Sequence, residues 1–235
     1  LSQLYEHLAS IEQRCLLCFN PLTHGMTFID VFLTEDVLCK ECRNSLKKVE
    51  RWVDVEGVKV FAYYEFDEKM STLFHRYKEA HDQALGKLFL HPVHRTFDKK
   101  FKGKTIVCVP SSKKKREERG FMTLHTILGE SRLVRVDVLE KLSDEKQSLR
   151  SAAMRREIKH EMHLANPMLV ERKDILLFDD IVTTGSSMRA CSGLLRENAR
   201  SLTHVCIAIH PNFLKIEEKG RGKAKKAKDK SAFNL

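Results

Sequence analysis

The sequence predicts an α/β fold, in which helices flank a parallel sheet and a small cysteine-bearing unit precedes it. Three observations support this prediction. Apolar runs at residues 105–109, 175–178 and 202–209 are short and suit buried parallel strands. Amphipathic helical patterns alternate with these runs over short joins, which favours parallel pairing through right-handed crossovers. Two Cys-x2-Cys pairs lie near the N-terminus, ahead of the strands and helices.

The size and charge of the chain fit this fold and narrow its partners. With 235 residues, 42% of them apolar, the chain can form one such domain and a small appendage. We find no run of about eighteen apolar residues and no signal-peptide pattern in the first thirty residues. We therefore expect a cytoplasmic protein that can also lie against the inner face of the membrane. The net charge of +10 favours phosphates, nucleic acid or an anionic membrane face as partners.

Three regions are predicted along the chain. Residues 1–50 form a unit with the cysteine pairs, in which helical spacing predicts a helix over 1–12 and an apolar run predicts a strand over 26–33. Residues 51–212 form the main domain. The lysine-rich residues 213–235 are predicted to be a disordered basic tail, because few apolar residues are available there to form a core.

The main domain is predicted to alternate strands with amphipathic helices. The strands are predicted over 58–64, 105–109, 175–178 and 202–209. Helices are predicted over 67–77, from about residue 121, and after the third strand. The last of these helices has an apolar face made of Met188, Cys191, Leu194 and Leu195. Ligands of such sheets bind at the carboxyl ends of the strands. The polar residues after 105–109 and after 175–178 therefore mark the predicted site.

Residues 175–187 combine a buried strand, two carboxylates and a turn of small hydroxyl residues. Gly185 lets the backbone approach an anion, and the helix N-terminus that follows presents free N–H groups to a phosphate. The carboxylates can accept hydrogen bonds from ribose hydroxyls or attract Mg²⁺ through water. A solvated strand end beside a capped helix is the simpler alternative, but the whole string favours ribose 5-phosphate. The predicted contacts are Asp179, Asp180, Thr183, Thr184, Gly185, Ser186 and Ser187.

Four of the seven cysteines form two Cys-x2-Cys pairs separated by twenty residues. Each pair can hold Zn²⁺ from one tight turn, and four thiolates leave no open position for water, which predicts a structural zinc ribbon. Four unrelated buried thiols are the alternative. The predicted zinc ligands are Cys15, Cys18, Cys39 and Cys42. The remaining cysteines are assigned to the core: Cys108, Cys191 and Cys206.

Residues 175–187 resemble the binding signature for phosphoribosyl pyrophosphate in type I phosphoribosyltransferases. The resemblance implies that the two carboxylates bind the ribose hydroxyls, that residues 183–187 surround the 5-phosphate, and that Mg²⁺ accompanies the ligand. It also implies a second loop that holds the pyrophosphate, at residues 109–113. The implied contacts there are Ser111, Ser112, Lys113 and Arg119, with further charge from Lys114, Lys115 and Arg116; a solvated basic loop is the alternative.

Two Cys-x2-Cys pairs ahead of a phosphoribosyltransferase-like domain resemble the ComF family. The resemblance covers about residues 15–210. Segments that agree include 61–65, 73–78, 106–110 with 119–121, Gln147 with Arg155 or Arg156, and 175–187. Met122 and Thr123 stand where the family usually has Asn-Gln, and Lys159 stands near the place of an expected Asn. These departures bear on catalysis more than on ligand binding.

The resemblance implies two classes of function. The first is a competence protein that acts in DNA uptake during natural transformation, binds single-stranded DNA and a phosphoribosyl pyrophosphate-type ligand, and meets a competence helicase or a recombination protein. Candidate rings for base stacking are Phe19, Phe28, Phe32, Tyr63, Tyr64 and Tyr77, although most aromatics at such spacings belong to a core. The second is an active phosphoribosyltransferase that transfers ribose 5-phosphate to an amine or base. We favour the first.

Overall fold

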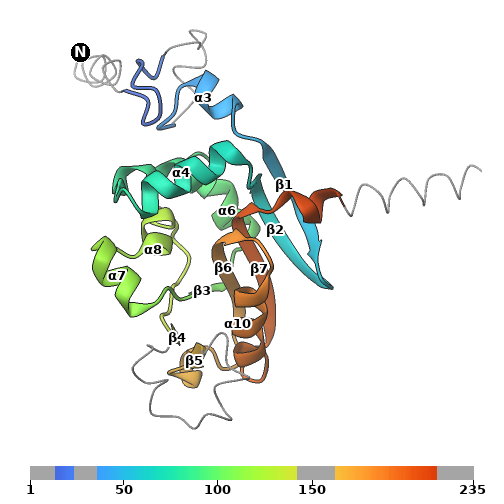
Figure 1. Cartoon of the computed structure of the whole chain (residues 1–235). Coiled ribbons are helices and arrows are strands. Elements are labelled where there is room, and N and C mark those ends of the chain that lie inside the picture. The colour runs from blue at the N-terminus through green and yellow to red at the C-terminus, as the bar shows by residue number, and fades with distance from the viewer. Residues whose placement is uncertain (1–13, 24–35, 142–161, 216–235) are drawn as a thin grey trace, which may run out of the picture.

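A computed structural model of the chain describes residues 14–23, 36–141 and 162–215 (Figure 1). Several predictions lie outside these residues: the helix over 1–12, the strand over 26–33, the family segment from Gln147 to Lys159, and the tail from residue 216.

A five-stranded sheet forms the centre of the fold, in the order β1-β2-β7-β6-β3. Its strands are β1 (Lys48–Val55), β2 (Val58–Glu65), β3 (Thr105–Cys108), β6 (Asp174–Val182) and β7 (Ser201–Ile209). Only the β1–β2 pair is antiparallel; β2–β7, β7–β6 and β6–β3 are all parallel. The predicted α/β fold is therefore confirmed, and its sheet is parallel as predicted except at the added edge strand β1.

β1 is an edge strand that the apolar pattern does not predict. Six of its eight residues are exposed or half-buried, since only Val53 and Val55 are buried. It is fixed by a two-residue turn to β2, in which Glu56 and Gly57 have φ angles of 51° and 86°. Such positive φ angles at both positions match the right-handed twist of a hairpin.

Strand β6 runs further than the predicted range of 175–178. Asp179 pairs with Cys206, and Val182 pairs with Ile209, so the two carboxylates lie inside the strand and not after it. The parallel ladder with β7 imposes this conformation, although aspartate has a low preference for strands.

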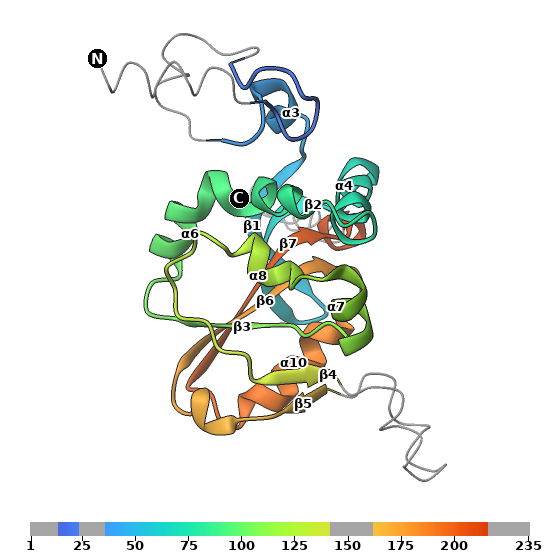
Figure 2. The ribbon, with the colours of Figure 1, turned by 90° about the vertical axis from the view of Figure 1, so that its left-hand side faces the viewer.

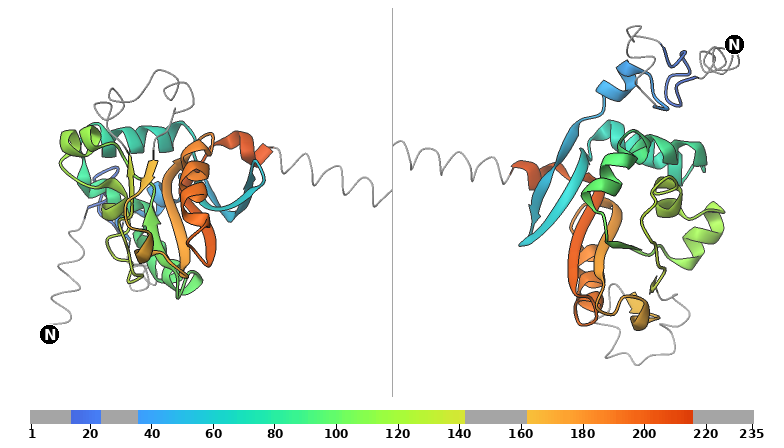
Figure 3. Two further views of the ribbon diagram at one scale, coloured as in Figure 1. Left: turned by 90° about the horizontal axis from the view of Figure 1, so that it is seen from below. Right: turned by 180° about the vertical axis from the view of Figure 1, so that it is seen from behind.

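The helices cover both faces of the sheet (Figure 3). Successive residues of a strand point to opposite faces. Ile106, Leu176 and Val205 thus enter one core with α4, α5, α6 and α8, while Val107, Leu177 and Cys206 enter a second core with α10. The bounds are α4 (Glu68–Lys78), α5 (Gly86–Leu90), α6 (His94–Lys100), α7 (Lys113–Arg119), α8 (Thr123–Ile127) and α10 (Ser186–Arg196), with 3₁₀ turns η1 (Gln83–Leu85), η2 (His91–Val93) and η4 (Pro167–Leu169).

The helices predicted at 67–77, from about 121 and along 188–195 are confirmed as α4, α8 and α10. Asp67 caps α4 by accepting a hydrogen bond from Met70 N at 2.9 Å, and the apolar face of that helix is buried as expected. Helix α7, in contrast, is not predicted. Its sequence contains only lysine, arginine and glutamate and has no apolar stripe, so residues 113–119 resemble a loop in sequence.

Three smaller elements lie outside the central sheet and the helices that cover it. Strands β4 (Leu139–Lys141) and β5 (Met162–Leu164) form an antiparallel pair, and Leu139 packs in the core on the α10 face. Helix α3 (Lys40–Asn44) leads directly into β1, so the cysteine unit lies at one end of the hairpin (Figure 1). Figure 2 looks onto the side of the molecule that carries α7 and α8.

Candidate ligand site and metal centre

The carboxyl ends of β3 and β6 border a cavity of about 260 Å³. Strand β3 pairs with β6 only as far as Phe178, and β6 then continues beside β7. The side of β6 that faced β3 is therefore open to the cavity from Asp179 onward. Six residues predicted for the ligand site line it together: Ser111, Ser112, Arg119, Asp179, Asp180 and Ser187.

The two carboxylates are held in different ways. Asp180 Oδ2 forms an ion pair with Lys78 Nζ at 2.6 Å, and both side chains are more than four-fifths buried. Asp179 Oδ1 accepts a hydrogen bond from Asp180 N at 2.9 Å. Burial, and then the adjacent Asp180, raise the pKa of Asp179 to about 7, although Lys78 acts in the opposite direction. Asp179 therefore holds its proton more tightly than an ordinary aspartate does.

Lys78 is a site residue that sequence analysis does not assign. It ends α4 and is far from the carboxylates along the chain, so no spacing relates them. It also lies 5.0 Å from the centroid of the Phe74 ring, which steadies its ammonium group. Its inclusion in the family segment 73–78 is the one sequence signal that points to it.

The predicted phosphate loop has the backbone that its glycine requires. Gly185 has a φ angle of +71°, and α10 begins at Ser186. Thr184 Oγ1 and Ser186 Oγ lie 2.9 Å apart. A methyl group at Gly185 would come within 2.7 Å of Val55 Cγ1, so the hairpin of β1 packs directly on the loop. The same hairpin is tied to α10 by an ion pair between Glu56 and Arg189.

Of this loop, Ser187 lines the cavity, whereas Thr183 and Thr184 are exposed and do not line it. Gly185 is buried against the hairpin, and Ser186 is half-buried. The structure thus gathers the two acids and one end of the loop around the same space. Assignment of the loop to a phosphate stays a prediction.

The second loop is shorter than predicted, because α7 begins at Lys113. Ser112 caps this helix, with its Oγ 3.4 Å from Lys115 N. Lys113 and Lys114 point to solvent, since 70% and 85% of their side-chain surface is exposed. Lys115, not Lys113, lines the cavity beside the serines.

Arg119 is buried and its guanidinium contacts protein groups. Its guanidinium pairs with Glu79 Oε1 at 2.8 Å and donates to the carbonyl of Lys78 at 3.1 Å, and 8% of its side chain is exposed. The ion pair lowers the pKa of Glu79. Arg119 therefore fixes the end of α4, and so Lys78, at the cavity.

The described tyrosines proposed as stacking rings are core residues. Tyr63, Tyr64 and Tyr77 are each at most 4% exposed, because they fill the face covered by α4 and α5. This corrects the idea that they bind bases. Phe19 is 63% exposed, and Phe28 and Phe32 lie outside the described residues.

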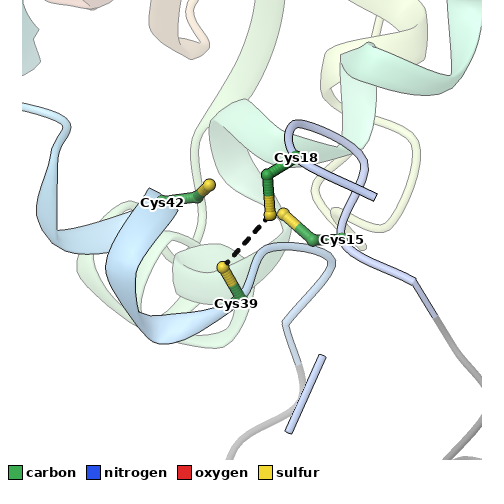
Figure 4. Close-up of side chains that lie close together, drawn as sticks. All are labelled: Cys15, Cys18, Cys39 and Cys42. Atoms are coloured by element: carbon green, nitrogen blue, oxygen red, sulfur yellow. Dashed lines mark hydrogen bonds between the residues drawn. The ribbon is translucent and has the colours of Figure 1, made fainter. Parts of the chain in front are cut away.

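The four cysteines of the two pairs converge (Figure 4). Their sulfur atoms all lie within 4.8 Å of one another, and Cys18 Sγ and Cys39 Sγ are 3.7 Å apart. A tetrahedral zinc site with Zn–S bonds of about 2.3 Å places its sulfurs about 3.8 Å apart, whereas a disulfide needs about 2.05 Å. The spacing fits a shared metal ion and excludes a bond between Cys18 and Cys39.

Two short segments hold the cysteines in this arrangement. The turn after Cys15 directs Leu17 N toward Cys15 Sγ at 3.4 Å, and Cys39 is the N-cap of α3. Burial raises the pKa of Cys15, but hydrogen bonds from the N–H groups of Cys18, Cys39 and Leu17 outweigh it and lower that pKa to about 7. It is the convergence of the four sulfurs that makes this donor set able to hold zinc. Cys191 and Cys206 are buried core residues as predicted, whereas Cys108 is half-buried at the end of β3.

Two curated relatives match most of the chain, although no family model does. The chain is 25% identical to competence protein ComFC of Streptococcus pneumoniae over 209 residues. This match covers 78% of the chain and 94% of that protein. The chain is also 24% identical to competence protein ComFC of Bacillus subtilis over 217 residues. This match covers 80% of the chain and 90% of that protein. The chain is ComFC-like.

Solved structures similar to the ComFC-like chain include two phosphoribosyltransferases. A hypoxanthine phosphoribosyltransferase of Staphylococcus aureus is 20% identical with a TM-score of 0.32, over 57% of this chain and 66% of that one. A purine phosphoribosyltransferase of Pyrococcus horikoshii is 15% identical with a TM-score of 0.31, over 52% of this chain and 71% of that one.

Arg43 joins the cysteine unit of the ComFC-like chain to its sheet. It follows Cys42 and pairs with both carboxylate oxygens of Asp36, at 2.5 and 2.6 Å. It also donates to Tyr64 Oη at 3.1 Å and to the carbonyl of Leu88 at 2.8 Å. Burial opposes its charge, but Asp36 and Tyr64 raise the pKa of Arg43 further. The buried guanidinium thus fixes the cysteine unit against β2 and α5.

Within the described part of the ComFC-like chain, no helix has the length and apolar character needed to span a lipid bilayer.

Proposed function

We propose that this ComFC-like chain acts in DNA uptake during natural transformation and that its cavity binds a phosphoribosyl pyrophosphate-type ligand. The two curated relatives are competence proteins and match about four-fifths of the chain, which supports the role in transformation. One observation carries the ligand proposal: the Asp179–Asp180 pair, Ser111–Ser112 and Ser187 border one cavity.

Each part of the cavity has a task in holding such a ligand. Asp179 and Asp180 accept hydrogen bonds from the ribose hydroxyls or hold Mg²⁺, which prefers oxygen ligands. The loop that ends at Ser187 offers N–H and hydroxyl donors to the 5-phosphate. Ser111 and Ser112 face the pyrophosphate from the opposite loop. Mg²⁺, when bound, neutralises charge on the pyrophosphate, and Lys78 supplies a fixed positive charge beside Asp180.

The same chain is proposed to bind single-stranded DNA through basic surface residues. Lys113 and Lys114 are exposed on α7, and Phe19 is an exposed ring on the cysteine unit. A net charge of +10 provides a long-range attraction for phosphates. Phosphate contacts and a stacking ring together bind single strands without reading their sequence.

The remaining assignments follow from this proposal. The cysteine cluster holds a structural Zn²⁺, and residues 1–50, 51–212 and 213–235 are its zinc unit, ligand domain and basic tail. The protein acts in the cytoplasm at the inner face of the membrane, where an incoming strand arrives. A competence helicase or a recombination protein is the partner that receives the strand.

Two measurements on one variant separate ligand binding from DNA binding. In Asp179→Asn/Asp180→Asn, transformation should be lost while affinity for single-stranded DNA is retained, because the acids do not contact the strand. Asp137→Asn, which neutralises an exposed carboxylate away from the cavity, is the control and should transform normally. Normal transformation by the double variant would refute a role for the cavity.

The DNA proposal has its own test in a salt titration. For single strands, log affinity should fall linearly with log salt, with a slope of about −0.7 for each phosphate contact. Lys113→Gln/Lys114→Gln should reduce that slope. A flat titration would contradict electrostatic binding.

An active phosphoribosyltransferase is the second candidate, and the same grouping of the two acids, the serines and Ser187 around one cavity favours it. Release of pyrophosphate should then depend on one particular acceptor and should be lost in Asp179→Asn. Binding without pyrophosphate release, for every amine and base tried, would leave the cavity as a ligand-sensing module.

A further inference from the structure

We infer that His91, His94 and Glu130 form a second, independent site for a divalent transition-metal ion. The site goes beyond the proposed function, since none of its residues lines the sugar-phosphate cavity or belongs to the cysteine cluster. It lies where η2 passes into α6, opposite the turn that follows α8. Two imidazoles and one carboxylate are a donor set that suits Zn²⁺ and other borderline divalent ions.

Local geometry brings the two histidines to one side of the chain. They are three residues apart: His91 begins the 3₁₀ turn η2, and His94 directly follows it as the first residue of α6. In a 3₁₀ turn the side chains at i and i+3 lie above one another. Their rings stack with centroids 5.7 Å apart and an interplanar angle of 28°. Both imidazoles therefore face the same point.

Glu130 supplies the third ligand from a distant part of the chain. One of its oxygens, Oε2, lies 2.6 Å from His91 Nδ1 and 3.6 Å from His94 Nδ1. The donor atoms of all three groups fall within 4.8 Å of one another. Donor atoms bound to one ion at about 2.1 Å are separated by about 2.9 to 3.4 Å. The His91–Glu130 pair must therefore open by less than about 1 Å to admit an ion.

The protein holds these groups in place before any ion binds. His94 Nδ1 lies 2.5 Å from the carbonyl of His91, a contact that orients the ring before an ion binds and that Nδ1 exchanges for the ion. Asp98, one turn further along α6, accepts hydrogen bonds from Ser131 Oγ at 2.6 Å and Arg132 N at 2.9 Å. Helix α6 thus supplies one ligand and also fixes the turn that carries Glu130.

The arrangement leaves coordination positions open. The three ligands line a cavity of about 710 Å³, together with His125 and Met122. About one-fifth of each histidine side chain and 39% of the Glu130 side chain is exposed. An ion held by three protein ligands at such a wall keeps water or a small ligand in its remaining positions. This differs from the cysteine cluster, where four sulfurs close the site.

Zinc titration of the full chain, with zinc already bound to its cysteines, tests this inference. Calorimetry should show one further ion per chain. His91→Gln/His94→Gln should weaken that binding by more than about a hundredfold, because it removes two ligands, and changes beyond the ligands already cost about 10- to 100-fold. His125→Gln, which alters a histidine of the same cavity outside the ligand set, is the matched control and should bind the ion normally.

Cobalt gives a readout that distinguishes the two metal sites. Co²⁺ at the cysteines produces intense sulfur-to-metal charge-transfer bands, whereas the second equivalent should add only weak visible bands. Glu130→Gln keeps the size and shape of the side chain and decides the matter if the double histidine variant fails to fold. Absence of a second ion in the native chain, or unchanged binding of that ion in either folded variant, would overturn the inference.

Discussion

Gly185→Ala tests whether the loop before α10 needs the backbone that the structure gives it. Gly185 has a φ of +71°, and a left-handed conformation costs a residue with a Cβ about 1–2 kcal/mol. The new methyl group would also lie 2.7 Å from Val55 Cγ1, well inside ordinary contact. Overpacking of this kind costs about 1–3 kcal/mol, so we expect a total loss of about 2–5 kcal/mol in the free energy of unfolding.

Denaturant unfolding measures this loss, and two further variants divide it into its parts. Adding Val55→Ala removes the steric contact, so Gly185→Ala should cost about 1–2 kcal/mol in that background, which is the backbone term alone. Gly193→Ala is the matched control within α10. Gly193 has open space around it, and the same change should stabilise the helix by about 0.5–1 kcal/mol.

The loop variant should also weaken the sugar-phosphate ligand. If the loop holds the phosphate, displacing it by the strain above should reduce affinity at least tenfold, equivalent to about 1.4 kcal/mol. A Gly185→Ala protein with native stability and native affinity would refute both the strain argument and the role of the loop.

Three other changes have definite expected outcomes. Arg43→Met should lower the free energy of unfolding by about 3–5 kcal/mol, because it leaves the buried carboxylate of Asp36 unpaired. The control Arg200→Met, at an exposed ion pair with Asp174, should cost at most about 1 kcal/mol. Equal losses in the two denaturant curves would contradict the argument. Because Asp179 has a pKa of about 7 in the fold and about 4 when unfolded, the folded state holds its proton more tightly, and stability from this group falls as pH rises from 4 to 7. Asp179→Asn should therefore stabilise the protein more at pH 8 than at pH 5, and denaturation curves with the same gain at both pH values would exclude the raised pKa. Cys39→Ser should lose zinc, measured by elemental analysis, and unfold the cysteine unit, since metal binding and folding are coupled there; unchanged zinc content would refute the cluster.

The parts of the fold that can be predicted are those that local pattern determines. Helix α4 has a capping aspartate and an apolar face at helical spacing, and the buried strands are short apolar runs, so each is visible in sequence. The four cysteines are visible for the same reason, because two tight turns set their spacing. Helix α7 has no apolar residue, and only its capping Ser112 and the terminal Gly120, with its φ of +74°, mark its ends.

The parts that cannot be predicted depend on contacts between distant segments. Lys78 meets Asp180 only because α4 and β6 end at the same edge of the molecule. The extension of β6 through its two acids depends on pairing with β7. Arginine is mostly found at protein surfaces, so the sequence does not predict that Arg43 is buried. Its burial follows from docking of the cysteine unit against Tyr64 and Leu88.

Calorimetric titration with phosphoribosyl pyrophosphate and Mg²⁺ tests the central claim most directly. The native chain should bind one equivalent, more weakly without Mg²⁺, and Asp179→Asn/Asp180→Asn should abolish the binding while circular dichroism shows an intact fold. No heat of binding in the native chain, or the same affinity in the folded double variant, would contradict the assignment of the cavity between β3 and β6.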